Sequence, residues 1–163
     1  MNLDNISLKN FTQLCLDEHK MVLSWRNCED VKKWMYTNHN ITLDEHLAFI
    51  EKLKSSSDML YFLVKGGEQN IAVLDFTNFN SKESSSYFGL YANPFIKYAG
   101  VGRVLEEVAL DYATNILNLQ TLKLEVFSAN IAVINLHKKY GFTIFATKEV
   151  NSLEVTCMEK GLT

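Results

Sequence analysis

A short glycine-containing segment, Lys97-Tyr98-Ala99-Gly100-Val101-Gly102, joins a strand-like run to an amphipathic helix. The run before it is Tyr87–Ala92, and the helix after it carries apolar residues on one face, at Val101, Val104, Leu105, Val108 and Tyr112. Glycines let the backbone approach a ligand closely, and the free N–H groups at a helix start point partial positive charge at an anion. A strand, a glycine loop and a helix in this order therefore predict a phosphate-binding turn in an α/β fold.

This loop fits neither common nucleotide-binding pattern. A P-loop needs Lys-Ser/Thr after its last glycine, whereas Gly102 is followed by Arg103-Val104. A dinucleotide fingerprint needs three glycines, and only Gly100 and Gly102 are present here. Taken alone, the loop is equally well explained as a helix start that contains glycine.

Composition limits the class of protein. With 163 residues and 47% hydrophobic content, the chain is long enough for one domain, residues 1–163, with a sizeable core. A net charge of -3 provides no basic field for nucleic acid or an anionic membrane surface. Cys15, Cys28 and Cys157 form no CxxC pair, and no signal peptide or membrane-spanning run is evident. We expect a reducing, cytoplasmic setting.

Hydrophobic periodicity gives the order of elements. Helical spacing covers residues 17–36, and the capping box Thr42-Leu43-Asp44-Glu45 opens a second helix. The expected strands are Leu60–Lys65 and Ile71–Phe76, joined at Gly66-Gly67, then Tyr87–Ala92, Thr121–Phe127, Thr143–Thr147 and Leu153–Met158. Further helices run from the glycine loop to Leu117 and from Asn130 to Tyr140, before Gly141. This order predicts an α/β fold, with a mixed central sheet of about six to seven strands flanked by about four helices.

Two separate motifs resemble the Gcn5-related N-acetyltransferase (GNAT) superfamily over residues 60–158. The superfamily's phosphate loop reads Gln/Arg-x-x-Gly-x-Gly/Ala, and Lys97 takes its first place here. Its second signature is Asn-x-x-Ala, an aromatic residue and Gly-Phe along one helix, and the matching positions are Asn130, Val133, His137 and Gly141-Phe142. The resemblance implies a single-domain GNAT fold that transfers an acetyl group.

The first third of the chain resembles a narrower group, the acetyltransferases of pseudaminic acid biosynthesis. The matching segments are Trp25-Arg26-Asn27, Trp34-Met35-Tyr36, His46–Ile50, Tyr61–Leu63, Gly89–Tyr91 and Asn93–Phe95. This resemblance implies direct acetyl transfer from acetyl-CoA to the 4-amino group of a UDP-4-amino-4,6-dideoxy-N-acetyl-altrosamine, a step that serves flagellin glycosylation. The partners implied are acetyl-CoA and the UDP sugar, with no metal. The sequence does not fix the oligomeric state, although a homodimer is compatible with it.

The resemblance also assigns residues to coenzyme A. The backbone N–H groups of the loop suit its pyrophosphate, with Lys97 adding charge, and the residues concerned are Ala99, Gly100, Val101, Gly102 and Arg103. In the superfamily the strand equivalent to Leu90-Tyr91-Ala92 diverges from its neighbour and pairs with pantetheine, and one of its amides meets the developing oxyanion. Asn130 would hold the pantetheine arm. No His/Cys cluster has the spacing of a metal site.

Glu125 and Asp75 are the candidate groups for removing a proton from the attacking amine. Each occupies an interior strand position where an apolar residue would be ordinary. A carboxylate beside the amine accepts its proton directly or through water, and partial burial raises the carboxyl pKa usefully. Two alternatives stay open: Glu125 pairs with Lys123 or another surface cation, or bulk water takes the proton.

His137 replaces the tyrosine that the superfamily often uses to protonate the departing thiolate. It follows Asn130 by seven residues, nearly two helical turns, so both lie on one side of the helix. A charged histidine donates a proton to a thiolate more readily than tyrosine does. The alternative is a solvated histidine beside Lys138 and Lys139, with water as the acid.

The acceptor pocket implied by the resemblance combines aromatic residues, methionine and cations, at Arg26, Met35, Tyr36, His46, Phe49 and Tyr87. Aromatic and methionine side chains suit uracil or the methyl group of a deoxy sugar, and arginine suits phosphate. Core packing is the ordinary explanation for Met35, Phe49 and Tyr87. Two other functions stay open: amino-terminal acetylation of proteins and non-catalytic sensing of acetyl-CoA.

Overall fold

A computed structural model describes residues 3–162 of the chain and contains one seven-stranded sheet, in the order β1-β2-β3-β4-β5-β7-β6. The strands are β1 (Ile6–Asn10), β2 (Met59–Gly66), β3 (Gln69–Asn80), β4 (Ser85–Ala92), β5 (Thr121–Phe127), β6 (Thr143–Val150) and β7 (Leu153–Gly161). The helices are α1 (Leu16–Asn27), α2 (Glu29–Lys32), α3 (Leu43–Lys54), α4 (Val101–Asp111) and α5 (Ile131–Lys139). The predicted mixed sheet is confirmed: β4 and β5 are parallel, and all other neighbours are antiparallel.

Two features at the amino-terminal end differ from the sequence prediction. The strand β1 pairs with β2 and was not predicted, although Ile6 and Leu8 alternate with polar residues. The single helix expected over residues 17–36 is two helices, because Cys28 is extended, with ψ 136°. The Asn27 side chain forms hydrogen bonds to both backbone groups of Ile41, at 2.8 Å each, and this fixes the chain where α1 ends.

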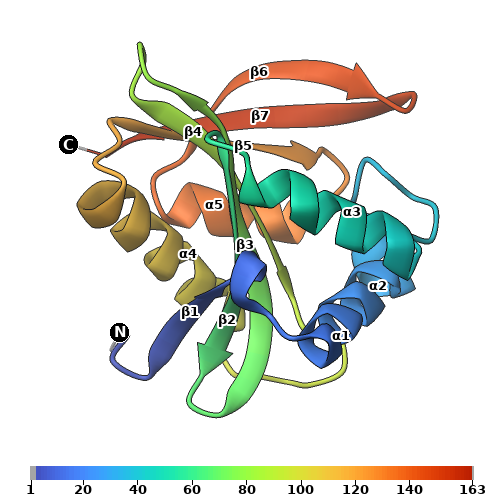
Figure 1. Cartoon of the computed structure of the whole chain (residues 1–163). Coiled ribbons are helices and arrows are strands. Elements are labelled where there is room, and N and C mark those ends of the chain that lie inside the picture. Colours follow the sequence, from blue (N-terminus) through green and yellow to red (C-terminus); the bar gives the residue numbers. More distant parts are fainter. Residues whose placement is uncertain (1–2, 163) are drawn as a thin grey trace.

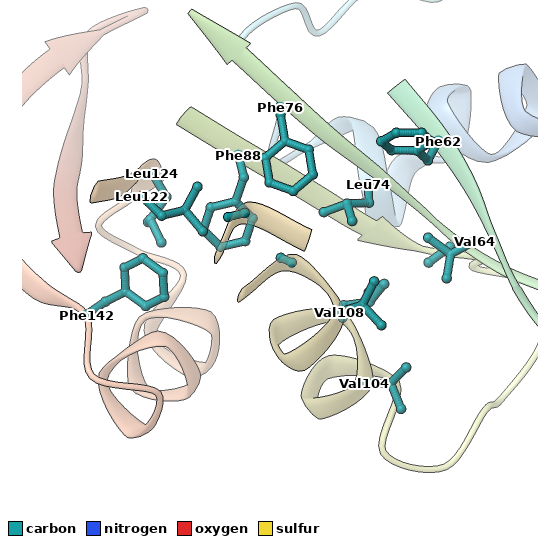
Figure 2. Close-up of a cluster of buried hydrophobic side chains, with 14 of the residues drawn as sticks. Phe62, Val64, Leu74, Phe76, Phe88, Val104, Val108, Leu122, Leu124 and Phe142 are labelled. Carbon is teal, nitrogen blue, oxygen red and sulfur yellow. The ribbon is translucent and has the colours of Figure 1, made fainter. Parts of the chain in front are cut away.

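The helices cover both faces of the sheet (Figure 1). Helices α1 and α3 pack on one face, where Trp25 and Ile50 meet Leu63 and Val73. Helices α4 and α5 pack on the other face, where the buried residues include Phe62, Val64, Leu74, Phe76, Phe88, Val104, Val108, Leu122, Leu124 and Phe142 (Figure 2). No helix within residues 3–162 is long and apolar enough to cross a membrane.

Strands β4 and β5 diverge partway along their length. They pair only at Ser85–Tyr87 with Thr121–Lys123, although β4 remains paired with β3 as far as Ala92. On its other side β5 remains paired with β7 as far as Phe127. The facing edges of β4 and β5 therefore carry backbone groups that no strand satisfies, which in a sheet marks a place for a ligand. This divergence is the one expected for the strand that contains Leu90-Tyr91-Ala92.

Candidate active site

The glycine loop leads directly into α4 beside the opening between β4 and β5. Gly100 forms the N-cap of α4 with φ +72°, a left-handed conformation that favours glycine. The Val101 N–H donates to the Tyr98 carbonyl at 3.1 Å, and the Val104 N–H donates to the Gly100 carbonyl at 3.0 Å. The N–H groups of Gly102 and Arg103 lie in the first turn, where helix amides lack a partner within the helix.

The loop is also suited electrostatically to an anion. The first turn of α4 contains no acidic residue, and the side chains of Lys97 and Arg103 are exposed. Helix α5 packs closely on this turn, because a Cβ at Gly102 would lie 2.9 Å from Leu136 Cδ2. Asn130 is the N-cap residue of α5, and its side chain makes no capping hydrogen bond. The segment from Ala99 to Arg103 thus forms a helix start without acidic residues in its first turn, and its binding of a pyrophosphate stays a prediction.

The open stretch of β4 presents different side chains to the two faces of the sheet. Leu90 packs with the α4 and α5 core, whereas Tyr91 packs with the α1 and α3 core. Ala92 is the last paired residue of the strand and lies opposite Ala72 of β3. The backbone of this stretch faces the opening, so the predicted pairing with a pantetheine arm has the edge that it requires.

Asp75 lies on the α1 and α3 face with two tyrosines and an arginine. It pairs with Tyr61 of β2 and with Gly89 of β4 in the strand register. Burial raises the pKa of the Asp75 carboxyl to about 7, and the Gly89 backbone opposes this shift. Burial, and then the Asp75 charge, raise the pKa of Tyr61 above its usual range. Asp75 is therefore close to half-ionised near neutral pH, as a group that exchanges protons requires.

Arg26 is partly enclosed rather than solvated at the end of its helix. Its Nη2 donates to the Thr37 carbonyl at 2.8 Å, and its Nη1 is buried without a hydrogen-bond partner among residues 3–162. Burial lowers the pKa of the Arg26 guanidinium, and Tyr91 and Tyr61 oppose that shift. A buried donor with no partner is costly in the free protein. Arg26 is therefore available to an anionic or carbonyl-bearing ligand on this face.

Glu125 is held by two groups that the sequence did not connect with it. Its Oε1 accepts a hydrogen bond from the Tyr36 hydroxyl at 2.7 Å, and its Oε2 lies 2.8 Å from Lys148 Nζ. Lys123 instead forms an ion pair with Glu83 at 3.1 Å. Of the surface-cation alternatives, Lys123 is thus wrong, and the cation is Lys148 of β6.

Three of the predicted acceptor residues lie near Glu125 in the structure or next to a residue that contacts it: Tyr36, Met35 and Tyr87. The Tyr36 ring lies edge-on to Phe127 at 5.5 Å, and its carbonyl accepts a hydrogen bond from Asn151 Nδ2 at 2.7 Å. Tyr87 is in register with Lys123, at the last pair before β4 and β5 diverge. Met35 is half-buried beside Tyr36.

His46 and Phe49 occupy positions deeper under α3. Phe49 is half-buried and lies edge-on to Tyr61 at 5.0 Å. His46 is 8% exposed, its Nε2 is 3.0 Å from His19 Nδ1, and its ring contacts Phe11. Burial lowers the pKa of His46 to about 4. His46 thus pairs with His19 and packs on Phe11, which also contacts Tyr61, and its role in the acceptor pocket stays a prediction.

His137 is an interior residue. Its side chain is 5% exposed, and Nδ1 contacts the fully buried Glu106 carboxylate of α4. The alternative of a solvated histidine beside Lys138 and Lys139 is wrong, because residue 137 faces inward whereas the two lysines are exposed. The proton-donor role of His137 stays a prediction.

Sequence reasoning gave no role in the site to four residues that contact its predicted members, namely Gly89, Tyr61, Lys148 and Glu106. The position of Tyr61 could have been inferred from the strand pattern, because Tyr61 and Leu63 alternate onto the face of the sheet that also holds Asp75. The burial of Glu106 could also have been inferred from the sequence. The small residues Gly102, Ala109 and Ala113 share its side of the helix and predict close packing there. No sequence pattern points to Lys148, because it reaches Glu125 only through the pairing of β6, β7 and β5.

The described residues contain no group of three or more histidine, cysteine, aspartate or glutamate side chains placed to hold a metal ion.

Comparison with known proteins agrees with this arrangement. The acetyltransferase (GNAT) domain family matches residues 16–152. The chain is 44% identical over 140 residues to the acetyltransferase PseH of Campylobacter jejuni, covering 86% of each chain. The crystal structure of C. jejuni N-acetyltransferase PseH with acetyl coenzyme A has a TM-score of 0.79 at 34% identity, over 97% of this chain and 99% of that chain.

A more distant structure shares the fold. The spermidine N-acetyltransferase of Vibrio cholerae, solved with CoA and spermine, has a TM-score of 0.86 at 21% identity, over 97% of this chain and 96% of that chain. The family match and the curated relative together establish the membership that the two motifs predicted. The chain belongs to the GNAT family of acetyltransferases.

Proposed function

We propose that this protein transfers the acetyl group of acetyl-CoA directly to the 4-amino group of a UDP-4-amino-4,6-dideoxy-N-acetyl-altrosamine in pseudaminic acid biosynthesis. The observation that carries the proposal is the opening between β4 and β5, which has a phosphate-binding helix start beside it and the Arg26, Asp75 and Glu125 face next to it. The identity to PseH and the resemblance of the first third of the chain support the choice of acceptor.

The donor half of the site is formed by α4, α5 and β4. The amides at Gly102 and Arg103 bind the coenzyme A pyrophosphate, and Lys97 adds positive charge. Pantetheine pairs with the free edge of β4 at Leu90–Ala92, and a backbone N–H of that edge stabilises the oxyanion that forms on the thioester carbonyl. Asn130 holds the pantetheine arm.

On the acceptor side the amine must lose a proton as its nitrogen attacks the thioester carbon. Asp75 is suited to receive this proton, because burial brings the pKa of its carboxyl to about 7. Glu125 already accepts a hydrogen bond and pairs with a lysine, so it is better suited to bind and orient the substrate. We therefore assign proton removal to Asp75 and positioning to Glu125.

The chemistry of the acceptor face fits a nucleotide sugar. Tyr36 and Tyr87 provide rings, Lys148 and Arg26 provide positive charge, and Arg26 Nη1 lacks a partner among residues 3–162. An amino-terminal peptide would be bound mainly through its backbone in a groove. A pyrophosphate with an attached base uses the aromatic and cationic side chains better.

The test is release of free thiol from acetyl-CoA by the purified full chain. The acceptors are UDP-4-amino-4,6-dideoxy-N-acetyl-altrosamine, its other 4-amino epimers and short peptides with free amino termini. Turnover confined to the altrosamine sugar supports the proposal. Turnover with peptides alone overturns the sugar acceptor, and acetyl-CoA binding without turnover on any acceptor indicates a sensor.

A homodimer is part of the same proposal. The edge strand β6 exposes Ile144 (49%) and Phe145 (43%), and an edge strand with apolar side chains favours pairing with another chain. Light scattering after size-exclusion chromatography measures the mass in solution, and a monomer at assay concentration overturns this part.

A further inference from the structure

A buried carboxylate lies at the centre of α4 and contacts the histidine of the second motif. Glu106 is 0% exposed and shares its side of the helix with Gly102, Ala109 and Ala113. Its Oε1 contacts Nδ1 of His137 on α5. Neither carboxylate oxygen has any other polar partner among residues 3–162. His137 is thus the one polar partner of this carboxyl group among residues 3–162.

The imidazole is held on its other sides by aromatic rings. Phe88 of β4 lies edge-on to it at 5.8 Å and 81°, and Phe142 lies edge-on at 5.7 Å and 67°. Phe88 follows Tyr87, the last residue of β4 that pairs with β5. The ring of His137 therefore lies against the strand where the opening begins, in surroundings that allow it little freedom to rotate.

We propose that Glu106 is a positioning residue that prepares His137 to protonate the departing thiolate of coenzyme A. This inference rests on the proposed acetyl transfer. The contact places Oε1 where it would accept a hydrogen bond from Nδ1–H; that bond would fix one proton on Nδ1 and leave Nε2 as the nitrogen that serves the reaction. The negative charge of Glu106 also stabilises the imidazolium among apolar side chains, where an isolated cation would be unfavourable.

The proton balance of the step is simple. The amine nitrogen forms a bond to the thioester carbon, and the carbon–sulfur bond then breaks with its electron pair on sulfur. The thiolate takes the proton from Nε2 of the His137 imidazolium, giving free coenzyme A thiol and neutral imidazole. The neutral ring keeps the proton on Nδ1, directed at the Glu106 carboxylate. Water then returns a proton to Nε2 before the next turnover. The amine's own proton leaves through Asp75.

Four variants test the pair in the full-length enzyme, with acetyl-CoA and the best acceptor: Glu106→Gln, Glu106→Asp, His137→Phe and the double variant Glu106→Gln/His137→Phe. Positioning predicts that Glu106→Gln lowers kcat by about tenfold or more, as loss of acid catalysis does, while KM for acetyl-CoA stays within about twofold. Glu106→Asp should recover part of kcat. The double variant should lose no more than His137→Phe alone, because both changes remove one function. Glu107→Gln, at the next residue on α4, is the matched control.

A second readout does not depend on activity. Ring ¹⁵N chemical shifts of His137, assigned by comparison with His137→Phe, report which nitrogen carries a proton. The wild-type protein should hold a proton on Nδ1, and Glu106→Gln should weaken that preference. An unprotonated Nδ1 in the wild-type protein, or a folded Glu106→Gln variant with wild-type kcat, overturns the inference. Absence of thiol release by the wild-type protein on every acceptor instead overturns the proposed function, and the ¹⁵N shifts then still decide whether the hydrogen bond exists.

Discussion

The Asp75 carboxylate lies in space that a side chain at Gly89 would occupy. The two residues are register partners on β3 and β4, and a Cβ at position 89 would lie 2.8 Å from Asp75 Oδ2. Glycine at this position therefore allows the carboxylate to extend across β4 toward the opening. We expect Gly89→Ala to displace the carboxylate and to lower kcat by roughly tenfold, with KM for acetyl-CoA little changed. Steady-state kinetics check this, and an unchanged kcat would mean that Asp75 tolerates the displacement.

Asp75 should also give the protein a characteristic dependence on pH. The folded carboxyl has a pKa of about 7, above its ordinary value of 3.8, so the native state binds more protons than the unfolded state between these values. Stability therefore falls as pH rises through this window, by roughly 2–4 kcal/mol, and kcat/KM rises as the carboxylate forms. Asp75→Asn should remove this fall in stability and the rise in kcat/KM with pH. Urea unfolding and rate measurements from pH 5 to 8 test this, and a rising limb that persists in Asp75→Asn would assign the proton to another group.

The backbone geometry of the glycine loop was readable from the sequence because its determinants are local. Gly100 and Gly102 lie within one short segment, so their spacing predicts a helix start there, and α4 begins at Val101 with Gly100 as its N-cap. The same is true of β5, whose alternation gives its bounds, and of the capping box at Thr42, which the structure contains. Where a few consecutive residues determine the geometry, the prediction and the structure agree.

The acceptor side was readable only in part, because its contacts join distant segments. Glu125 meets Tyr36 across 89 positions of sequence, and its cation comes from β6. The resemblance assigned His46 and Phe49 to one acceptor pocket but could not reveal that His46 pairs with His19. The end of α1 at Asn27 likewise depends on Ile41, which lies beyond the reach of periodicity.

The left-handed conformation of Gly100 allows a test of the donor site that leaves side-chain packing intact. A Cβ at this position meets nothing within 4 Å, so Gly100→Ala introduces only backbone strain at φ +72°. That strain is about 1–2 kcal/mol and is relieved by shifting the loop. We expect KM for acetyl-CoA to rise several-fold while kcat at saturation is retained. Gly161→Ala, where a Cβ also meets nothing and φ is ordinary, is the control. Equal KM values for the two variants would contradict a role for the loop in binding.

Arg26 and Arg103 should affect different substrates. Arg26 lies on the acceptor face with an unpartnered Nη1, whereas Arg103 lies exposed in the first turn of α4. Lysine keeps the charge but loses the planar arrangement of donors. Arg26→Lys should therefore raise KM for the UDP sugar by about tenfold, the expected loss for a hydrogen bond to a charged group. Arg103→Lys should raise mainly KM for acetyl-CoA. Initial rates with each substrate varied in turn measure both KM values. Equal changes of the two KM values in both variants would refute the assignment of Arg26 to the UDP sugar and of Arg103 to acetyl-CoA.

The pair formed by His19 and His46 should make the fold sensitive to acid. Burial lowers the pKa of both rings, that of His46 to about 4, so the unfolded state binds more protons between about pH 4 and 6.5. Through this window the pair therefore contributes a loss of stability as pH falls, about 1–2 kcal/mol at pH 5 for His46, which opposes the gain from Asp75. His46→Gln keeps a hydrogen-bonding group beside His19 but does not titrate, so its free energy of unfolding should rise relative to that of the wild-type protein on going from pH 7 to pH 5.

Urea unfolding followed by circular dichroism at the two pH values measures this difference. His39→Gln is the matched control, because the His39 side chain is 63% exposed and pairs only with Glu45 among the described residues. The same change in stability between the two pH values in His46→Gln as in the wild-type protein would show that His46 does not contribute to the pH dependence. Since the pair joins α1 to α3, protonation of both rings would weaken the packing of these two helices on each other. Activity on the UDP sugar should therefore fall at the same pH as this contribution to stability does.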